Sequence, residues 1–112
     1  MSSRHWRLLV EDILDCVERI EQYVGNLQLD AFKASQITVD ATVRNLEVIG
    51  EASRNIPESV KEAHPELEWA KILGLRNRVI HEYFGVDLDI IWRIVKDELP
   101  VLKAKMRELL VS

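Results

Sequence analysis

The chain has 112 residues, of which 47% are hydrophobic and 30% charged, and this size fits one globular domain spanning residues 1–112. A net charge of -4 argues against a protein that coats nucleic acid nonspecifically, because such binding depends on neutralising phosphates. No apolar run reaches the roughly 18 residues of a membrane span, and residues 1–6 lack the apolar stretch of a secretory signal. We therefore expect a cytosolic protein with no membrane partner.

The first half of the chain predicts two long helices, and no segment alternates in the way a strand would. A first apolar stripe steps by three and four residues and should end at Gly25 and Asn26; it comprises Trp6, Leu9, Ile13, Cys16, Ile20, Tyr23 and Leu27. A second stripe has the same spacing and ends before Pro57; it comprises Val39, Thr42, Leu46, Ile49, Ser53 and Ile56. Gly50 lies within the second helix and should allow a close approach by a neighbouring backbone.

The second half of the chain predicts three more helices. Residues 57–63 suit a short helix, which His64 and Pro65 would end. A helix over residues 68–83 follows, with Gly85 as its C-cap. The last helix begins at Asp87 or Asp89, and Pro100 must bend or split it; its stripe is Leu88, Ile91, Val95, Leu99, Leu102, Met106 and Leu109. The fold expected is all-α, an antiparallel up-down bundle of four main helices plus a short helix.

Charge is spread unevenly along the chain. Residues 11–30 carry acids at six positions against a single base, Arg19, whereas residues 69–81 carry Lys71, Arg76 and Arg78 and no acid. A phosphate would therefore be drawn to the second of these segments.

That same segment combines side chains suited to phosphodiester chemistry. The guanidinium of Arg76 is always charged and can fork onto phosphate oxygens, and the imidazole of His81 can give or take a proton near neutral pH. Together they suggest RNA cleavage without a metal. On a helix, Arg76 and Tyr83 would fall in the middle of an apolar face, so Arg76 should be paired or should face a cleft. A buried salt bridge to Glu47 or Glu51 is the structural alternative.

The arrangement of these groups on a straight helix favours two subunits. Asn77 lies four residues before His81 and could orient the imidazole or contact a phosphate oxygen, although a solvated helix edge would have the same spacing. His81 would lie about 140° around the helix from Arg76, so one protomer would not aim both at one phosphate. Paired motif helices of a two-fold dimer could do so, and their interface would cover the apolar face.

Other candidate sites are weaker. Cys16 lies on an apolar stripe and is predicted to be a small core residue. His5 and His64 have no matching ligands and are predicted to be exposed or locally packed. No zinc motif and no glycine-rich phosphate loop is present, so no metal or other cofactor is expected.

The motif and its flanks resemble the HEPN superfamily, specifically the HepT-like toxins that are paired with minimal nucleotidyltransferase antitoxins. The core of the resemblance is R-x4-H-x-Y, here Arg76, His81 and Tyr83, with Asn77 as the polar residue after the arginine. Residues 45–52 and 85–92 resemble the flanking segments of that family. The resemblance extends over nearly the whole domain.

This resemblance implies a homodimeric helical bundle that acts as a metal-independent endoribonuclease toxin of a type VII-like toxin–antitoxin pair. With Arg76 and His81 in one motif, our leading hypothesis is that His81 transfers protons and Arg76 stabilises charge during cleavage of a transfer or messenger RNA, with Asn77 orienting and Arg78 holding a neighbouring phosphate. The resemblance also implies that the nucleotidyltransferase transfers AMP to Tyr83. The alternative is a noncatalytic module that binds a nucleotide or a partner through the same cleft.

Overall fold

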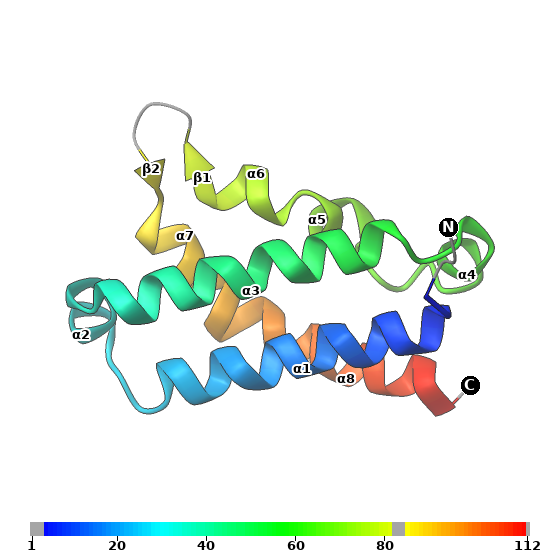
Figure 1. Cartoon of the computed structure of the whole chain (residues 1–112), viewed down its shortest axis with the longest axis horizontal. Coiled ribbons are helices and arrows are strands. Elements are labelled where there is room, and N and C mark those ends of the chain that lie inside the picture. Colours follow the sequence, from blue (N-terminus) through cyan, green and yellow to red (C-terminus); the bar gives the residue numbers. More distant parts are fainter. Residues whose placement is uncertain (1–3, 82–84, 112) are drawn as a thin grey trace.

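The fold is an antiparallel helical bundle, seen in a computed structural model that describes residues 4–81 and 85–111, apart from the side chain of His81. Four helical segments run alternately in opposite directions (Figure 1). They are α1 (Trp6–Val24), α3 (Gln36–Arg54), α5 (Trp69–Leu73) with α6 (Leu75–Val79), and α7 (Leu88–Arg93) with the π-helical turn η1 (Ile94–Glu98) and α8 (Leu99–Val111). The all-α, up-down prediction is confirmed.

The helices α1 and α3 pack against each other along the predicted stripes. Most stripe residues of α1 are buried, and Gly25 caps its C-terminus as expected. Tyr23 departs from the prediction because it is 40% exposed, while its neighbour Val24 is buried in its place. All six stripe residues of the second predicted helix, Val39, Thr42, Leu46, Ile49, Ser53 and Ile56, are buried.

The close approach predicted at Gly50 brings α5 against α3. A Cβ atom added at Gly50 would lie 3.3 Å from the carbonyl oxygen of Ile72 and 3.6 Å from that of Leu73. The first of these distances is tighter than an ordinary van der Waals contact. The absence of a side chain at Gly50 thus sets how near the segment α5–α6 comes to α3.

Two short helices complete the connections. Helix α4 (Glu58–Ala63) was predicted and begins after Pro57 and ends at His64. Helix α2 (Leu29–Ala34) was not predicted, because six residues are too few to establish a helical period. Its one buried residue, Phe32, is fully enclosed and packs on Trp92 with ring centroids 5.3 Å apart.

The prediction of one helix over residues 68–83 is wrong. The helix is interrupted at Gly74 and ends at Val79, and the next residues, Ile80 and His81, form strand β1 (Ile80–His81). This strand pairs antiparallel with β2 (Gly85–Val86), with Ile80 opposite Val86 and His81 opposite Gly85. Gly85 has φ of 75°, so it serves the hairpin and is not a helix C-cap.

The last helical segment begins where the sequence predicts, and its α-helical geometry is interrupted just before Pro100, as expected. The side chain of Asp87 caps α7 by accepting from the amide of Ile90. Immediately before Pro100 the helix widens into η1, in which the amide of Leu99 donates to the carbonyl of Ile94. Because proline lacks an N–H, the regular hydrogen bond of an α-helix is missing at residue 100.

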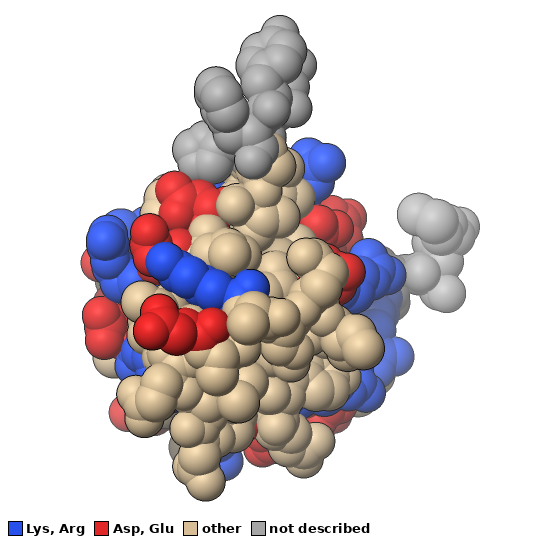
Figure 2. All heavy atoms as spheres, turned by 90° about the vertical axis from the view of Figure 1, so that its left-hand side faces the viewer, with Lys and Arg blue, Asp and Glu red and all other residues tan. Residues whose placement is uncertain are grey.

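The end of the bundle that carries α2 shows a broad surface with few charged groups (Figure 2). Tyr23, near the end of α1, is 40% exposed and Ile37, at the start of α3, is 84% exposed. Lys33 and Asp89 form an ion pair with a 2.8 Å separation.

Among residues 4–81 and 85–111, no helix has the length and apolar character needed to cross a bilayer.

Candidate active site

Arg76 lies on the exposed side of α6. Its neighbours Leu75 and Val79 are buried, whereas Arg76 and Asn77 are exposed. The prediction that Arg76 lies in the middle of an apolar face is therefore wrong. The cause is local: residues 75 and 79, one helical turn apart, define the buried side of this short helix, and residue 76 points about 100° away from residue 75.

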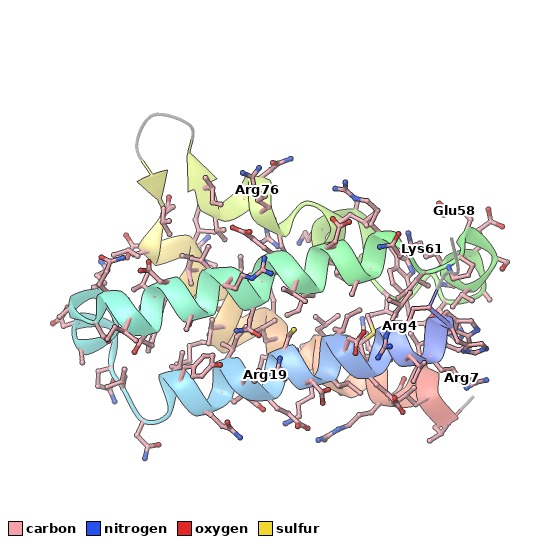
Figure 3. All side chains as sticks on the ribbon, viewed as in Figure 1. Arg4, Arg7, Arg19, Glu58, Lys61 and Arg76 are labelled. Atoms are coloured by element: carbon pink, nitrogen blue, oxygen red, sulfur yellow. The ribbon has the colours of Figure 1, made fainter. Side chains whose placement is uncertain are left out.

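Arg76 forms part of the wall of an open groove between α1, α3 and α6, with a volume of about 590 Å³. In Figure 3, Arg76 lies on α6 and Arg19 on α1, on either side of α3. The charged residues that line the groove are Asp12, Asp15, Arg19, Arg44, Glu47, Glu51 and Arg76. Four acids thus share the groove with three arginines.

The buried salt bridge considered for Arg76 is not formed. Glu47 and Glu51 line the same groove, but none of the ion pairs within 4.0 Å among the described residues joins either of them to Arg76. The Arg76 guanidinium is exposed to solvent and its charge is available to an anion in the groove.

Arg78, two residues further along α6, has a different environment. Its Nη1 and Nη2 atoms donate to Oε1 and Oε2 of Glu98 at 2.8 and 2.5 Å, in a bidentate ion pair. These hydrogen bonds raise the pKa of the Arg78 guanidinium and lower the pKa of the Glu98 carboxyl. The phosphate contact predicted for Arg78 would have to compete with this pair.

The backbone of His81 lies in strand β1, just beyond the end of α6. It pairs with Gly85 across the hairpin, so the predicted angle of about 140° from Arg76 on a helix is wrong. Asn77 and His81 are not neighbours on a helix surface either, because the helix ends at Val79. The side chain of His81 and all of Tyr83 lie outside the described residues, and their roles stay predictions.

The remaining candidates have structural positions that agree with the sequence. Cys16 is 2% exposed, and burial raises the pKa of its thiol, so it is a core residue. His5 is exposed and caps α1 by accepting from the amide of Arg7, and His64 is half-buried with Nδ1 3.2 Å from Oε1 of Glu66. Within the described part of the chain, no three or more His, Cys, Asp or Glu side chains are grouped as metal ligands.

Apart from Glu47 and Glu51, which the sequence offers as acids for Arg76, the charged groove residues on α1 and α3 are not predicted as part of the site, although their spacing carries a signal. Asp12, Asp15 and Arg19 step by three and four along α1, and Arg44, Glu47 and Glu51 do the same along α3. Such a stripe lies on one side of a helix, next to the apolar stripe. Two charged stripes on helices that pack together imply a polar groove between them.

Sequence comparison relates the chain to known proteins. The family described as "Ribonuclease HepT-like" matches residues 13–109. A protein of Thermococcus cleftensis named "Probable ribonuclease HepT" is 41% identical over 100 residues, which cover 89% of this chain and 91% of that protein. A "Putative RNase" of Methanocaldococcus jannaschii is 35% identical over 106 residues, with coverage of 95% and 97%. A "Putative RNase" of Caldanaerobacter subterraneus subsp. tengcongensis is 38% identical over 104 residues, with coverage of 93% of each chain.

No solved structure matches the chain. The family match spans most of the sequence, and the relatives are covered over nearly their full length. The chain belongs to the HepT-like ribonuclease family of the HEPN superfamily.

Proposed function

We propose that this protein is an endoribonuclease that cleaves RNA without a metal or another cofactor. The observation that carries the proposal is Arg76: an exposed arginine without an ion pair among the described residues, in an open groove, five residues before a histidine on the adjoining hairpin. Membership of the HepT-like ribonuclease family supports the same activity. A transfer or messenger RNA is the substrate class.

In the proposed reaction the ribose 2'-hydroxyl attacks the adjacent phosphorus and the 5'-oxygen of the next nucleotide leaves. His81 would transfer protons as general base or acid, and Arg76 would stabilise the charge that develops on the pentacoordinate phosphate. Asn77, which is exposed beside Arg76, would orient the reacting groups. The products would be a 2',3'-cyclic phosphate and a 5'-hydroxyl.

We propose further that the active protein is a homodimer, in which the motifs of two copies border one RNA-binding cleft. A second copy would add an Arg76 and a His81 to the site, so that groups from different protomers could act on one phosphate. The family resemblance supports this arrangement. Size-exclusion chromatography with light scattering would detect it as a doubled mass.

The proposed biological role is the toxin of a type VII-like toxin–antitoxin pair. A nucleotidyltransferase antitoxin would neutralise it by AMPylation: the Tyr83 hydroxyl attacks the α-phosphate of ATP and pyrophosphate leaves. Incubation with the transferase encoded beside this protein and ATP should add the mass of one AMP to the wild type and none to Tyr83→Phe. An unchanged adduct on the phenylalanine variant would exclude Tyr83 as the acceptor.

Cleavage of total RNA in the presence of EDTA tests the nuclease proposal. Loss of a proton-transfer group typically lowers a rate by a factor of about 10² to 10⁴, so His81→Ala should be inactive while its circular dichroism and mass in solution match the wild type. A substrate with 2'-deoxyribose at the scissile position should resist. Equal cleavage of that substrate would rule out attack by the 2'-hydroxyl.

A noncatalytic binding module is the second candidate, and the acidic side chains of the groove favour one that docks its transferase, because they would repel the phosphates of ATP as well as those of RNA. The groove residues Asp12, Asp15, Glu47 and Glu51 would repel an RNA backbone. A purified wild-type protein that cleaves no RNA but binds ATP, or co-purifies with its transferase, would support this function over the nuclease.

A further inference from the structure

The helix that carries Arg76 is too short to be stable without contacts to the rest of the bundle. Helix α6 has five residues, and its own hydrogen bonds include those from the amide of Arg78 to the carbonyl of Gly74, at 3.0 Å, and from the amide of Ile80 to the carbonyl of Arg76. Helices of this length are marginally stable in isolation, because their few hydrogen bonds do not offset the backbone entropy lost when the helix forms. The placement of Arg76 therefore depends on what α6 contacts.

Two kinds of contact hold α6 within the bundle. Leu75 and Val79 are 3% and 0% exposed where α6 packs on α3 and α7. The carbonyl of Val79 also accepts a hydrogen bond from the amide of Asp87 at 2.8 Å. The second kind of contact is an ion pair between side chains: the bidentate pair of Arg78 with Glu98 joins α6 to η1.

Arg78 and Arg76 face different hollows. Arg78 and Glu98 line a cavity of about 270 Å³ between α5–α6 and η1–α8, whereas Arg76 lines the groove against α1 and α3. Residues two apart on a helix point about 160° apart. A phosphate held by Arg76 is thus on the other side of α6 from the guanidinium of Arg78.

The carboxylate that reaches Arg78 comes from an irregular turn. Glu98 is the last residue of η1, the π-helical turn that precedes Pro100. A π turn changes the direction in which its side chains point relative to a regular α-helix, and such turns are frequent at functional sites. With side-chain exposures of 28% and 34%, Arg78 and Glu98 are partly shielded from water, which favours a persistent bidentate pair.

We propose that Arg78 and Glu98 form a positioning pair, which anchors α6 to η1 and so fixes Arg76 and the strand of His81 in their working arrangement. Its catalytic consequence rests on the proposed ribonuclease function. In this role Arg78 does not touch the RNA, and the π turn before Pro100 supplies the carboxylate that holds it.

Charge reversal separates this role from a phosphate contact. Arg78→Glu and Glu98→Arg should each lower kcat at least tenfold with less than a threefold change in KM for RNA, and the double variant should regain activity to within about threefold of wild type. If Arg78 instead holds a phosphate, Arg78→Glu should raise KM, Glu98→Arg should be close to wild type, and the double variant should stay impaired. That second pattern would overturn the proposal.

Hydrogen exchange provides a readout that needs no nuclease activity. The amides of Arg78 and Ile80, which bond within α6, should exchange at least tenfold faster in each single variant and return towards wild-type rates in the double variant. Amides of α1 should be unchanged. Should a reversed charge prevent folding, Glu98→Gln removes the charge at nearly constant shape and should speed exchange in α6 by about two- to fivefold.

A second ion pair serves as the matched control. Lys103 Nζ lies 2.8 Å from Oε1 of Glu21 and joins α8 to α1 away from α6. Charge reversal at Lys103, at Glu21 or at both should leave kcat and the hydrogen-exchange rates of the α6 amides unchanged. Unaltered α6 exchange in the Arg78 and Glu98 variants would refute the positioning role, whatever the activity. A wild type without nuclease activity, but with the predicted exchange pattern, would refute the proposed function and leave the positioning role intact.

Discussion

The three cations between residues 69 and 81 differ in their partners. Lys71 pairs with Glu68 at 3.2 Å on an exposed surface, and Arg78 pairs with Glu98. Arg76 has no ion pair among the residues that the structure describes, although four carboxylates line its groove. Its charge is therefore the one most available to a phosphate, a distinction that composition alone could not make.

Arg76→Gln tests that distinction. Because Arg76 is exposed and unpaired within the described chain, its loss should leave the melting temperature nearly unchanged. Removal of a group that stabilises transition-state charge should lower kcat by a factor of about 10² to 10³. Steady-state cleavage of a fluorogenic RNA and a thermal melt measure both effects. A large drop in melting temperature would point to a structural role for Arg76.

Glu98 makes stability depend on pH with a defined sign. Its pKa is lowered in the folded state, first by the hydrogen bonds from Arg78 and also by the charges of Arg78, Lys71 and Arg93, while desolvation opposes this shift. A carboxyl with a depressed folded pKa stabilises the fold above its unfolded pKa of about 4.3, and that stability is lost as pH falls through the folded pKa.

Urea unfolding of wild type and Glu98→Gln at several pH values tests this sign. At pH 7 the wild type should be more stable by about 0.5–1 kcal/mol, a modest value because the pair is partly exposed. The difference should shrink as pH falls below about 4.3 and vanish once Glu98 is protonated. A difference that is the same at pH 7 and pH 3 would show that the carboxylate charge does not stabilise the fold.

At the scale of helices and strands, the sequence predicts the long elements and misses the short ones. The stripes of α1, α3 and the α7–α8 segment are readable because each long helix buries one side in a common core. Residues 69–80 form a short segment that is rich in apolar side chains. In so short a segment the apolar pattern does not distinguish a helix from an extended chain. The hairpin depends on pairing with residues 85–86, which no local periodicity reveals.

The sequence proposes candidate residues for the site more readily than it predicts how they are arranged. Residue chemistry and spacing make Arg76 and Asn77 candidates, and both are exposed, which is compatible with a binding role. The ion pair of Arg78 could not, because Glu98 is 20 residues away in sequence and lies on a π turn. Such long-range contacts depend on how the elements pack.

Gly85→Ala tests whether the hairpin matters to the site. A Cβ atom there would meet nothing within 4 Å, but the φ of 75° disfavours a side chain by about 1–2 kcal/mol. This strain should disturb the hairpin that carries His81 and lower kcat at least tenfold. Gly85→Asn should be milder, since asparagine tolerates positive φ. Cleavage rates of the two variants, compared at equal folded fraction, decide; equal rates for wild type and Gly85→Ala would separate the hairpin from catalysis.

At the scale of the whole molecule, the surfaces limit how two copies can meet. The apolar face of the motif segment was predicted to be covered by a partner, and that prediction is wrong because Leu75 and Val79 are buried inside their own chain. Leu75 and Val79 are therefore not available to a dimer contact. The end of the bundle with few charged groups, where Ile37 is 84% exposed, is one surface on which two acidic chains would not repel strongly (Figure 2).

The number of phosphate contacts sets how RNA binding should respond to salt. For single-stranded nucleic acid, log K falls with log salt with a slope of about -0.7 for each phosphate neutralised. Two copies of Arg76 in one dimeric cleft would give a slope of about -1.4, and added phosphate contacts from two copies of Arg78 would bring it to about -2.8. The positioning role of Arg78 therefore predicts the shallower value.

Measurement of kcat/KM between about 50 and 300 mM KCl, at fixed pH and with the chemical step rate-limiting, yields the slope. Arg76→Gln should flatten it towards zero, whereas a wild-type slope steeper than about -4 would reveal phosphate contacts elsewhere on the surface and refute a site built on Arg76 alone.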